Sequence, residues 1–249
     1  MNNSQVALDS DPISCMIITV MNQKGGSAKT TTCVNLAGAF KKAGYRVAIV
    51  DLDPQVSVTF WKSIEQEEGL FPCEAYTLAM KKAVFEPDAA RNHSRRIRGE
   101  MQSLAKMYDV LVLDTSAAVG DPAVPAALAL SDFALIPVRP GALDIGSTLE
   151  SWQVAELACA SNPDLVSRVV LVDVDRNSAA EQVRETVKRH PAWAHAVARS
   201  EIDHRAAFAK AALLGGTVYA TDNGAAKGQM DLLMAEIVEL IKAQREAAQ

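Results

Sequence analysis

A short stretch rich in glycine and lysine, residues 22–32 (NQKGGSAKTTT), joins an apolar run to a segment with helical periodicity. Gly25 and Gly26 let backbone N–H groups approach phosphate oxygens, because neither carries a side chain. Lys29 would neutralise the β- and γ-phosphates of a nucleotide, and the Thr30 hydroxyl would bind Mg²⁺. The stretch therefore predicts a site for a nucleoside triphosphate at the start of a helix.

The stretch departs from the strict pattern GxxxxGK[ST] at two positions. Gln23 stands where the first glycine belongs, and Ala28 stands where the last one does. Alanine is tolerated at position 28 if its backbone angle φ is negative. The apolar run before the loop and the helical segment after it still supply the context in which such loops cradle phosphate.

Three aspartates come at or just after the ends of apolar, β-branched runs. Asp51 and Asp53 close the run IVDLD, and Asp114 closes VLVLD. The carboxyl ends of parallel strands meet at one edge of a sheet, so these carboxylates would lie beside the phosphate loop. Carboxylates bind Mg²⁺ and position water in phosphoryl transfer. The combination predicts a site for a nucleoside triphosphate with Mg²⁺ as cofactor.

These residues must be positioned by strands and helices that alternate along the chain. The predicted strands are Cys15–Met21, Arg46–Leu52, Val110–Asp114, Phe133–Val138, Arg168–Val174 and Thr217–Tyr219. The predicted helices are Lys29–Ala43, Gln55–Glu67, Ser94–Met107, Pro122–Leu130, Leu143–Ala160, Ala179–Arg189, Asp203–Leu213 and Ala226–Ala247. This alternation predicts an α/β fold, with one doubly wound and mostly parallel sheet.

The composition is that of a globular protein. The 249 residues are 49% hydrophobic and 22% charged, with a net charge of −5, which excludes a disordered chain and a strongly basic nucleic-acid binder. The four cysteines are widely spaced and favour reduced thiols over a zinc site. No signal peptide or membrane span is visible in the sequence. We expect a short N-terminal extension, residues 1–14, and one cytoplasmic domain, residues 15–249.

The motif KGGxxKT at residues 24–30 resembles the deviant Walker A motif of the ParA/MinD group of P-loop ATPases. The segment DLDPQ at residues 51–55 resembles the second strand end of that group, and the resemblance covers nearly the whole chain. It implies a face-to-face dimer that forms on ATP binding, in which Lys24 reaches the nucleotide of the partner. The ATP site would comprise Lys24, Gly25, Gly26, Ser27, Ala28, Lys29, Thr30 and Thr31.

The resemblance also assigns roles to the polar residues. Asp53 would orient the attacking water, and it would act with Lys24 and Lys29 as the catalytic set. Thr30 and Asp114 would hold Mg²⁺, partly through water, with Asp51 supporting the metal shell.

Two further segments are compared with the same group. Members usually carry two prolines shortly after the strand that corresponds to Val110–Asp114, where this chain has Ser116-Ala117. Asp144 follows a predicted strand and is expected as a helix N-cap, with a dimer contact as a second possibility.

Within the group, the chain resembles the small partition ATPases. Fewer than 20 residues precede the first predicted strand, which leaves no room there for a helix-turn-helix domain. The stretch 230–242 is amphipathic but mainly acidic on its polar side, which favours a core-packed helix over a membrane-binding one. Two alternatives stay open: a MinD-like membrane-cycling ATPase, and an ATP-dependent metabolic enzyme on the same fold.

A partition ATPase needs affinity for DNA without sequence preference, and lysine and arginine contacts to phosphate supply it. One basic region comprises Lys81, Lys82, Arg91, Arg95, Arg96, Arg98 and Lys106. A second comprises Arg176, Arg184, Lys188, Arg189, Arg199, Arg205 and Lys210. The resemblance favours the second, so the predicted DNA contacts are Arg184, Lys188, Arg189, Arg205 and Lys210. We expect a nucleoid-associated ATP dimer, released when a centromere-bound ParB-type adaptor stimulates hydrolysis.

Overall fold

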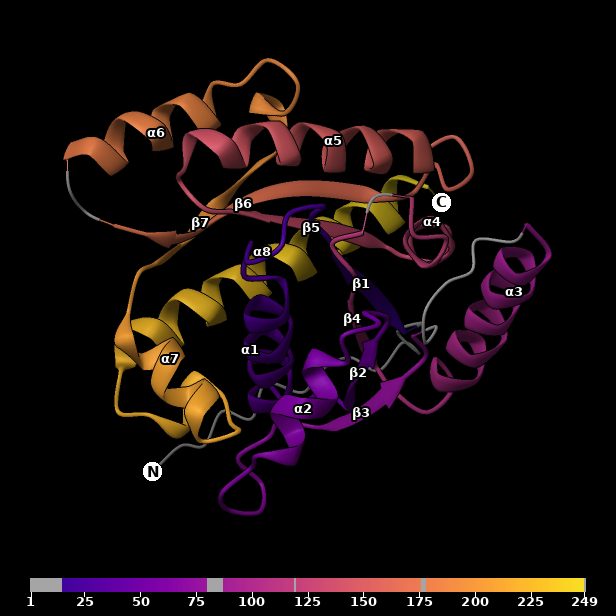
Figure 1. Ribbon diagram of the computed structural model, residues 1–249, viewed down its shortest axis with the longest axis horizontal. Helices are drawn as coiled ribbons and strands as arrows, with labels where there is room; N and C mark the ends of the chain where they lie inside the picture. Colours follow the sequence, from indigo (N-terminus) through magenta and orange to yellow (C-terminus); the bar gives the residue numbers. More distant parts are fainter. Residues whose placement is uncertain (1–14, 80–86, 119, 176–177, 249) are drawn as a thin grey trace.

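Seven parallel strands form one sheet at the centre of the protein (Figure 1). The computed structural model describes residues 15–79, 87–118, 120–175 and 178–248. Within these residues the strand order is β3-β2-β4-β1-β5-β6-β7, and every paired neighbour runs parallel. The strands are β1 (Met16–Val20), β2 (Val47–Asp51), β3 (Glu74–Thr77), β4 (Val110–Asp114), β5 (Phe133–Val138), β6 (Val166–Val174) and β7 (Val197–Asp203).

Helices cover both faces of the sheet. They are α1 (Lys29–Lys42), α2 (Ser57–Ser63), α3 (Pro87–Leu104), α4 (Ala123–Leu128), α5 (Ala142–Ala158), α6 (Ser178–Lys188), α7 (Ala206–Leu213) and α8 (Gly224–Ala247). Helices α1, α2, α7 and α8 share one apolar cluster with the sheet. Helices α3 and α4 pack on the other face over β2 and β4, and α5 and α6 pack there over β5 and β6. The single doubly wound α/β domain expected from the sequence is confirmed.

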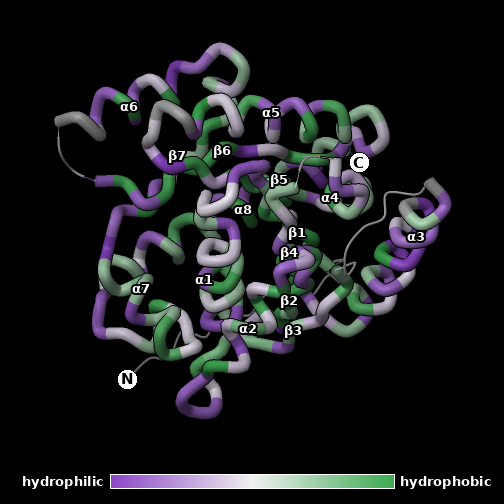
Figure 2. Tube along the Cα trace, in the orientation of Figure 1, coloured by the Kyte–Doolittle hydropathy of each residue, from purple (hydrophilic) through white to green (hydrophobic). Residues whose placement is uncertain are grey.

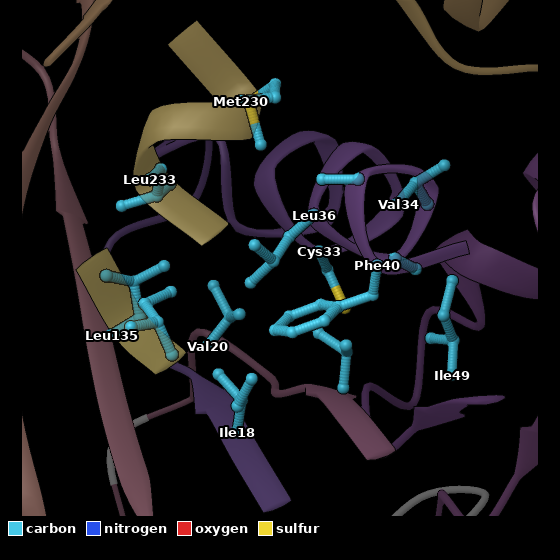
Figure 3. Close-up of a cluster of buried hydrophobic side chains, with 14 of the residues drawn as sticks. Ile18, Val20, Cys33, Val34, Leu36, Phe40, Ile49, Leu135, Met230 and Leu233 are labelled. Atoms are coloured by element: carbon cyan, nitrogen blue, oxygen red, sulfur yellow. The ribbon is translucent and has the colours of Figure 1, made fainter. Parts of the chain in front are cut away.

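The central strands are almost continuously apolar up to their carboxyl ends because both of their faces are covered. In β1, Ile18 and Val20 belong to the cluster beneath α1 and α8, whereas Ile17 packs toward α3 and α4. Figure 3 shows Ile18 and Val20 beside Leu36 and Phe40 of α1. Phe40 is fully buried, which contributes about 1.5–3 kcal/mol to stability.

Helix α8 is core-packed, as the sequence predicted. Its buried residues Met230, Leu233, Ile237 and Ile241 recur every three or four positions and lie in the cluster with α1. Asn223 caps its start, since its side-chain oxygen accepts a hydrogen bond from the Ala226 amide at 2.9 Å. One charged residue of this helix, Glu236, is also buried, and its carboxylate accepts hydrogen bonds from the amides of Arg199 and Ser200 at 2.8 and 2.9 Å.

Two of the predicted elements require correction, and two strands were not predicted. The segment Thr217–Tyr219 is not a strand: residues Val218–Ala220 form a 3₁₀ turn. There the Val218 amide donates to the Asn35 side chain at 2.8 Å, which replaces a sheet partner. Strands β3 and β7 were missed, because the first is a four-residue edge strand and the second carries charged residues. Helix α3 begins at Pro87 rather than at Ser94.

The register of the central strands creates the site. Val20 at the end of β1 and Asp51 at the end of β2 both pair with Asp114 at the end of β4. The loops that follow these three strands therefore leave the sheet side by side at its carboxyl edge.

We expect Gly215→Ala to lower the free energy of unfolding by about 2–4 kcal/mol. Gly215 has φ +70°, and an added Cβ would lie 2.4 Å from the backbone of Glu65, where α2 ends. Gly44→Ala is the matched control, since Gly44 has φ +93° with nothing near its Cβ position, so that it costs only the backbone strain of about 1–2 kcal/mol. Urea denaturation measures both, and equal losses would contradict the close approach.

Candidate nucleotide-binding site

A cavity of about 640 Å³ lies at the carboxyl edge of the sheet. The phosphate loop, the loop after β2 and the loop after β4 form its walls. Its lining residues are Gly25, Gly26, Ser27, Ala28, Lys29, Thr30, Thr31, Asp53, Pro54, Gln55, Ser57, Ser116, Ala117, Ala118, Asp121, Pro122 and Arg139. Seven of the eight residues predicted to bind ATP line this cavity, and Lys24 lies at the start of the same loop.

The phosphate loop uses left-handed backbone at two positions. Gly26 has φ +77°, which only glycine adopts without strain. Ala28 has φ +63° and directly precedes α1. The condition of a negative φ at Ala28 is therefore not met, and alanine there carries strain of about 1–2 kcal/mol. Glycine would adopt this backbone conformation at position 28 without strain. The surrounding structure holds Ala28 in it despite the strain.

Lys29 is the first residue of α1, and it is 7% exposed. Its Nζ donates a hydrogen bond to the Lys24 carbonyl oxygen at 3.2 Å. Burial lowers the pKa of Lys29, while the carboxylates of Asp114 and Asp53 act in the opposite direction. The ammonium group is thus desolvated at the mouth of a cavity, where an anionic ligand would restore its lost solvation.

Thr30 and Asp114 form the centre of the site. The Thr30 hydroxyl donates to Asp114 Oδ2 at 2.6 Å, and the second oxygen, Oδ1, is buried without a hydrogen-bond partner among the described residues. Burial raises the pKa of Asp114 to about 7, with a further increase from the neighbouring carboxylates. The Thr30 hydroxyl and the Asp114 carboxylate, with its one unpartnered oxygen, form a donor set that fits Mg²⁺.

Asp51 is fully buried and organises the loop after β2. One of its oxygens accepts from the Asp53 amide at 3.0 Å, and the other accepts from the amides of Val58 and Thr59 at 3.1 and 3.4 Å. Burial raises its pKa to about 6, and these backbone hydrogen bonds lower it in part. The geometry gives Asp51 a positioning role for Asp53, and its support of a metal shell stays a prediction.

Asp53 lines the cavity in a strained turn. Its Oδ1 accepts from the Gln55 amide at 2.9 Å, and Val56 has φ +49°. A β-branched residue with positive φ is a rare outlier, and such strain persists only where the surrounding contacts enforce it. The turn holds the Asp53 carboxylate toward the phosphate loop, as its predicted role requires.

Lys24 forms an ion pair inside its own chain. Its Nζ lies 2.8 Å from Oδ1 of Asp144, and Asp144 is mostly buried. Asp144 is the third residue of α5, where Gly141 is the N-cap, so the expectation of an Asp144 N-cap is wrong. Asn22 positions the loop start, since its side chain accepts from the Lys24 amide and donates to the Pro137 carbonyl, each at 2.9 Å.

The loop after β4 contains its own hydrogen bonds. The Ser116 hydroxyl donates to Asp121 at 2.6 Å and accepts from the Ala118 amide at 3.2 Å. Asp121 also accepts from the Ala123 amide at 2.9 Å, at the start of α4. Serine thus supplies local bonds in the place of the two prolines usual in the group.

Arg139 is a site residue that the sequence analysis missed. It follows β5, lines the main cavity, and its Nε lies 3.2 Å from Oδ2 of Asp173. A smaller cavity of about 150 Å³, lined in part by Arg139, Ala28 and Phe208, continues behind the phosphate loop. The position of Arg139 directly after the end of a predicted strand was the signal in the sequence that could have identified it.

The comparisons with known proteins agree with this geometry. The family model described as the CobQ/CobB/MinD/ParA nucleotide-binding domain matches residues 18–218. The chain belongs to this family. It is 32% identical over 167 residues to the maintenance of carboxysome distribution protein A of Gloeobacter kilaueensis, with 67% of each chain covered. It is 29% identical over 199 residues to the chromosome partitioning protein ParA of Myxococcus xanthus, covering 69% of this chain and 70% of the relative.

Solved structures of the ParA/MinD family share the fold. An ATP complex of a Cyanothece McdA variant superposes with a TM-score of 0.72 at 15% identity, over 91% of this chain and 97% of that one. MinD of Pyrococcus horikoshii, complexed with Mg-ADP, superposes with a TM-score of 0.63 at 18% identity, over 92% and 98% of the two chains.

The residues predicted to contact DNA do not lie on one surface. Arg184, Lys188 and Arg189 belong to α6 or directly follow it, whereas Arg205 and Lys210 lie at α7, on the other face of the sheet (Figure 1). Four of the five form ion pairs: Arg184 with Glu181 and Glu201, Lys188 with Glu201, Arg189 with Glu185, and Arg205 with Asp203. Their contact with DNA stays a prediction.

Some of the residues named in the sequence analysis cannot be placed in the structure. The predicted extension, residues 1–14, and the basic residues Lys81, Lys82 and Arg176 lie outside the described residues. Among the helices that the structure describes, none is both long and apolar enough to cross a membrane.

We expect Asp114→Asn to remove a pH-dependent loss of stability. With a pKa of about 7 when folded and about 3.9 when unfolded, Asp114 binds more protons in the folded state between these values. The free energy of unfolding of the wild type therefore falls as pH rises through this window, and is lowest above it. Relative to the wild type, the variant should gain roughly 2–4 kcal/mol between pH 4.5 and pH 8.

Urea denaturation at both pH values, with EDTA and without nucleotide, measures this difference. Asp109→Asn is the control. The Arg46 guanidinium lowers the pKa of Asp109, so removing this carboxylate should not raise the stability of the variant relative to the wild type as pH rises. A variant with the same pH dependence as the wild type would contradict the burial of a charged Asp114.

Proposed function

We propose that the protein is an Mg²⁺-dependent ATPase that positions DNA or another cargo by cycling on and off DNA. The observation that carries the ATPase is the buried Thr30–Asp114 pair with its unpartnered carboxylate oxygen, beside Lys29 in the phosphate loop. Membership of the nucleotide-binding family supports the same reaction. The relatives named for chromosome partitioning and carboxysome distribution support the positioning role.

In the proposed reaction, each residue acts on a defined part of ATP. Lys29 and the backbone amides of the phosphate loop bind the β- and γ-phosphates, and Thr30 and Asp114 hold Mg²⁺. When bound, Mg²⁺ neutralises the charge that develops on the phosphate oxygens. Asp53 orients the water that attacks the γ-phosphorus, while ADP leaves and inorganic phosphate forms. Hydrolysis is slow in isolation, since the cavity offers no strong general base.

Lys24 connects this reaction to dimer formation. In the single chain its ammonium is paired with Asp144 at 2.8 Å. In the proposed dimer, Lys24 leaves Asp144 and reaches the phosphates of the partner's nucleotide. The free energy of the Asp144 pair opposes this exchange, so two chains would close only around bound ATP.

The closed dimer binds DNA without sequence preference and remains at the nucleoid in the cytoplasm. An adaptor of the ParB type, bound to the cargo, stimulates hydrolysis and releases the dimer. The relative named for carboxysome distribution gives a second cargo class, a protein assembly, with the same chemistry. A membrane cycle of the MinD kind is disfavoured, because the apolar side of α8 packs in the core.

We expect Asp53→Ala to bind ATP with affinity close to that of the wild type and to lose ATP turnover by at least about 100-fold, because it removes the group that orients water. Nucleotide affinity is measured by titration with a fluorescent ATP analogue, and turnover by phosphate release. Asp53→Asn keeps an acceptor for the Gln55 amide but removes the negative charge. Comparing the two variants therefore distinguishes an effect of the lost charge from an effect of a changed loop conformation. Turnover unchanged in both variants would remove Asp53 from this role.

We expect the wild type to bind a random-sequence DNA duplex with ATP and not with ADP, and Lys29→Ala to lose this binding. Fluorescence anisotropy at several salt concentrations measures it, and the affinity should fall steeply with salt. No DNA binding by a protein that demonstrably binds ATP would contradict the partition function and leave the ATPase standing.

A further inference from the structure

Helix α3 presents arginines on the side that faces away from the sheet. Arg91, Arg95 and Arg98 follow one another at spacings of four and three residues, so they lie on one side of the helix. The opposite side buries His93, Ile97, Met101 and Leu104. Arg96 is also exposed, but it lies about 100° around the helix from Arg95 and so outside this row. We call Arg91, Arg95 and Arg98 the α3 arginine face; α3 lies at the margin of the molecule (Figures 1 and 2).

The α3 arginine face differs from the other basic region in its ion pairs. Arg91 pairs with Asp88, one helical turn earlier. Within the described residues, Arg95, Arg96 and Arg98 form no ion pair. At α6, by contrast, the three cations Arg184, Lys188 and Arg189 meet the three carboxylates Glu181, Glu185 and Glu201.

This difference decides which surface attracts a polyanion. A cation that already contacts a carboxylate must share its charge, so its net field at a phosphate is small. Arg95, Arg96 and Arg98 keep their full charge and their hydrogen-bond donors. The row from Arg91 to Arg98 spans about 10 Å at 1.5 Å per residue. A DNA duplex carries one phosphate charge per about 1.7 Å, so about six phosphate charges fall within that length.

We propose that the α3 arginine face is the surface through which this protein contacts the phosphates of DNA. The inference rests on the proposed DNA-binding function and names its surface. The partner is duplex DNA recognised through its phosphate backbone, without base contacts, because the face offers only guanidinium groups along an exposed helix.

Contacts on the inner side of α3 connect this face to the nucleotide cavity. His93 on the inner side of α3 is buried, and burial lowers its pKa, while the carboxylate of Asp121 acts in the opposite direction. Asp121 lines the nucleotide cavity and accepts the Ser116 hydrogen bond. Helix α3 also packs on α4, which follows this loop directly. Helix α3 is thus connected to the loop after β4 through its packing on α4.

The test removes two charges from each candidate surface in the full-length protein. Arg95→Gln with Arg98→Gln removes them from α3, and Lys188→Gln with Arg189→Gln removes them from the rival region at α6. Lys42→Gln with Lys62→Gln is the matched control on α1 and α2, where both lysines are ion-paired. Random-sequence duplex binding with ATP is measured by anisotropy across a salt series, with ATP affinity and thermal melting of each variant measured in parallel.

We expect the α3 variant to lose at least 10-fold in DNA affinity. Its plot of log affinity against log salt should become shallower by about 3–4, since a dimer loses four phosphate contacts. ATP affinity should stay unchanged, and the control should bind DNA as the wild type does. A loss confined to the α6 variant, with α3 unaffected, would overturn this surface while leaving the proposed function intact. A wild type that binds ATP but no DNA would overturn both.

Discussion

The buried carboxylate of Asp114 imposes the constraint on which the site depends. It lies at the end of β4 with the ends of β1 and β2 in register on either side, so no solvent reaches it. A buried charge is costly unless it is paired, and here Thr30 satisfies one oxygen while the other has no partner in the described structure. The fold thus builds a place for a cation before any ligand is present. Lys29, buried close by, creates the complementary place for an anion.

In the neighbouring loops, too, hydrogen bonds and ion pairs to buried polar groups fix the positions of the site residues. Asp51 accepts three backbone amides and thereby fixes the turn that carries Asp53. Lys24 is held by Asp144 on α5, and the Asn22 side chain accepts a hydrogen bond from the Lys24 amide at the start of the loop. These bonds form within one chain and are strong enough to order the site. The Lys24 pair is the one that exchanges most readily, because its ammonium is about one-third exposed whereas Asp51 is fully buried.

Much of this arrangement could be predicted from the sequence, because apolar strands that end in Asp or enter a glycine-rich loop are local patterns. The phosphate loop and strands β1, β2, β4 and β5 follow from such patterns. The φ of Ala28 could not be predicted, since it depends on how the loop closes over α1. The pairs of Arg184 with Glu181 and of Arg189 with Glu185 follow from their spacing on one helix. The pair of Lys188 with Glu201 does not, because Glu201 lies on β7 and the contact exists only after the sheet has formed. Strand β7 was itself missed, because burial on one side let it carry charged residues.

The same tertiary pairing explains how an acidic protein can hold a polyanion. The net charge of −5 describes the whole chain, but at about 0.1 M salt charges beyond about 10 Å are largely screened. What a phosphate experiences is therefore the balance of charges within one or two helical turns. At α6 that balance is near zero, because each cation has a carboxylate within 3 Å or in direct contact. Along α3, Arg95 and Arg98 have no ion-pair partner within the part of the chain that the structure describes, which is the basis for the positive local field that we propose there. A basic stretch in a sequence consequently identifies a DNA surface only when the fold leaves its charges uncompensated.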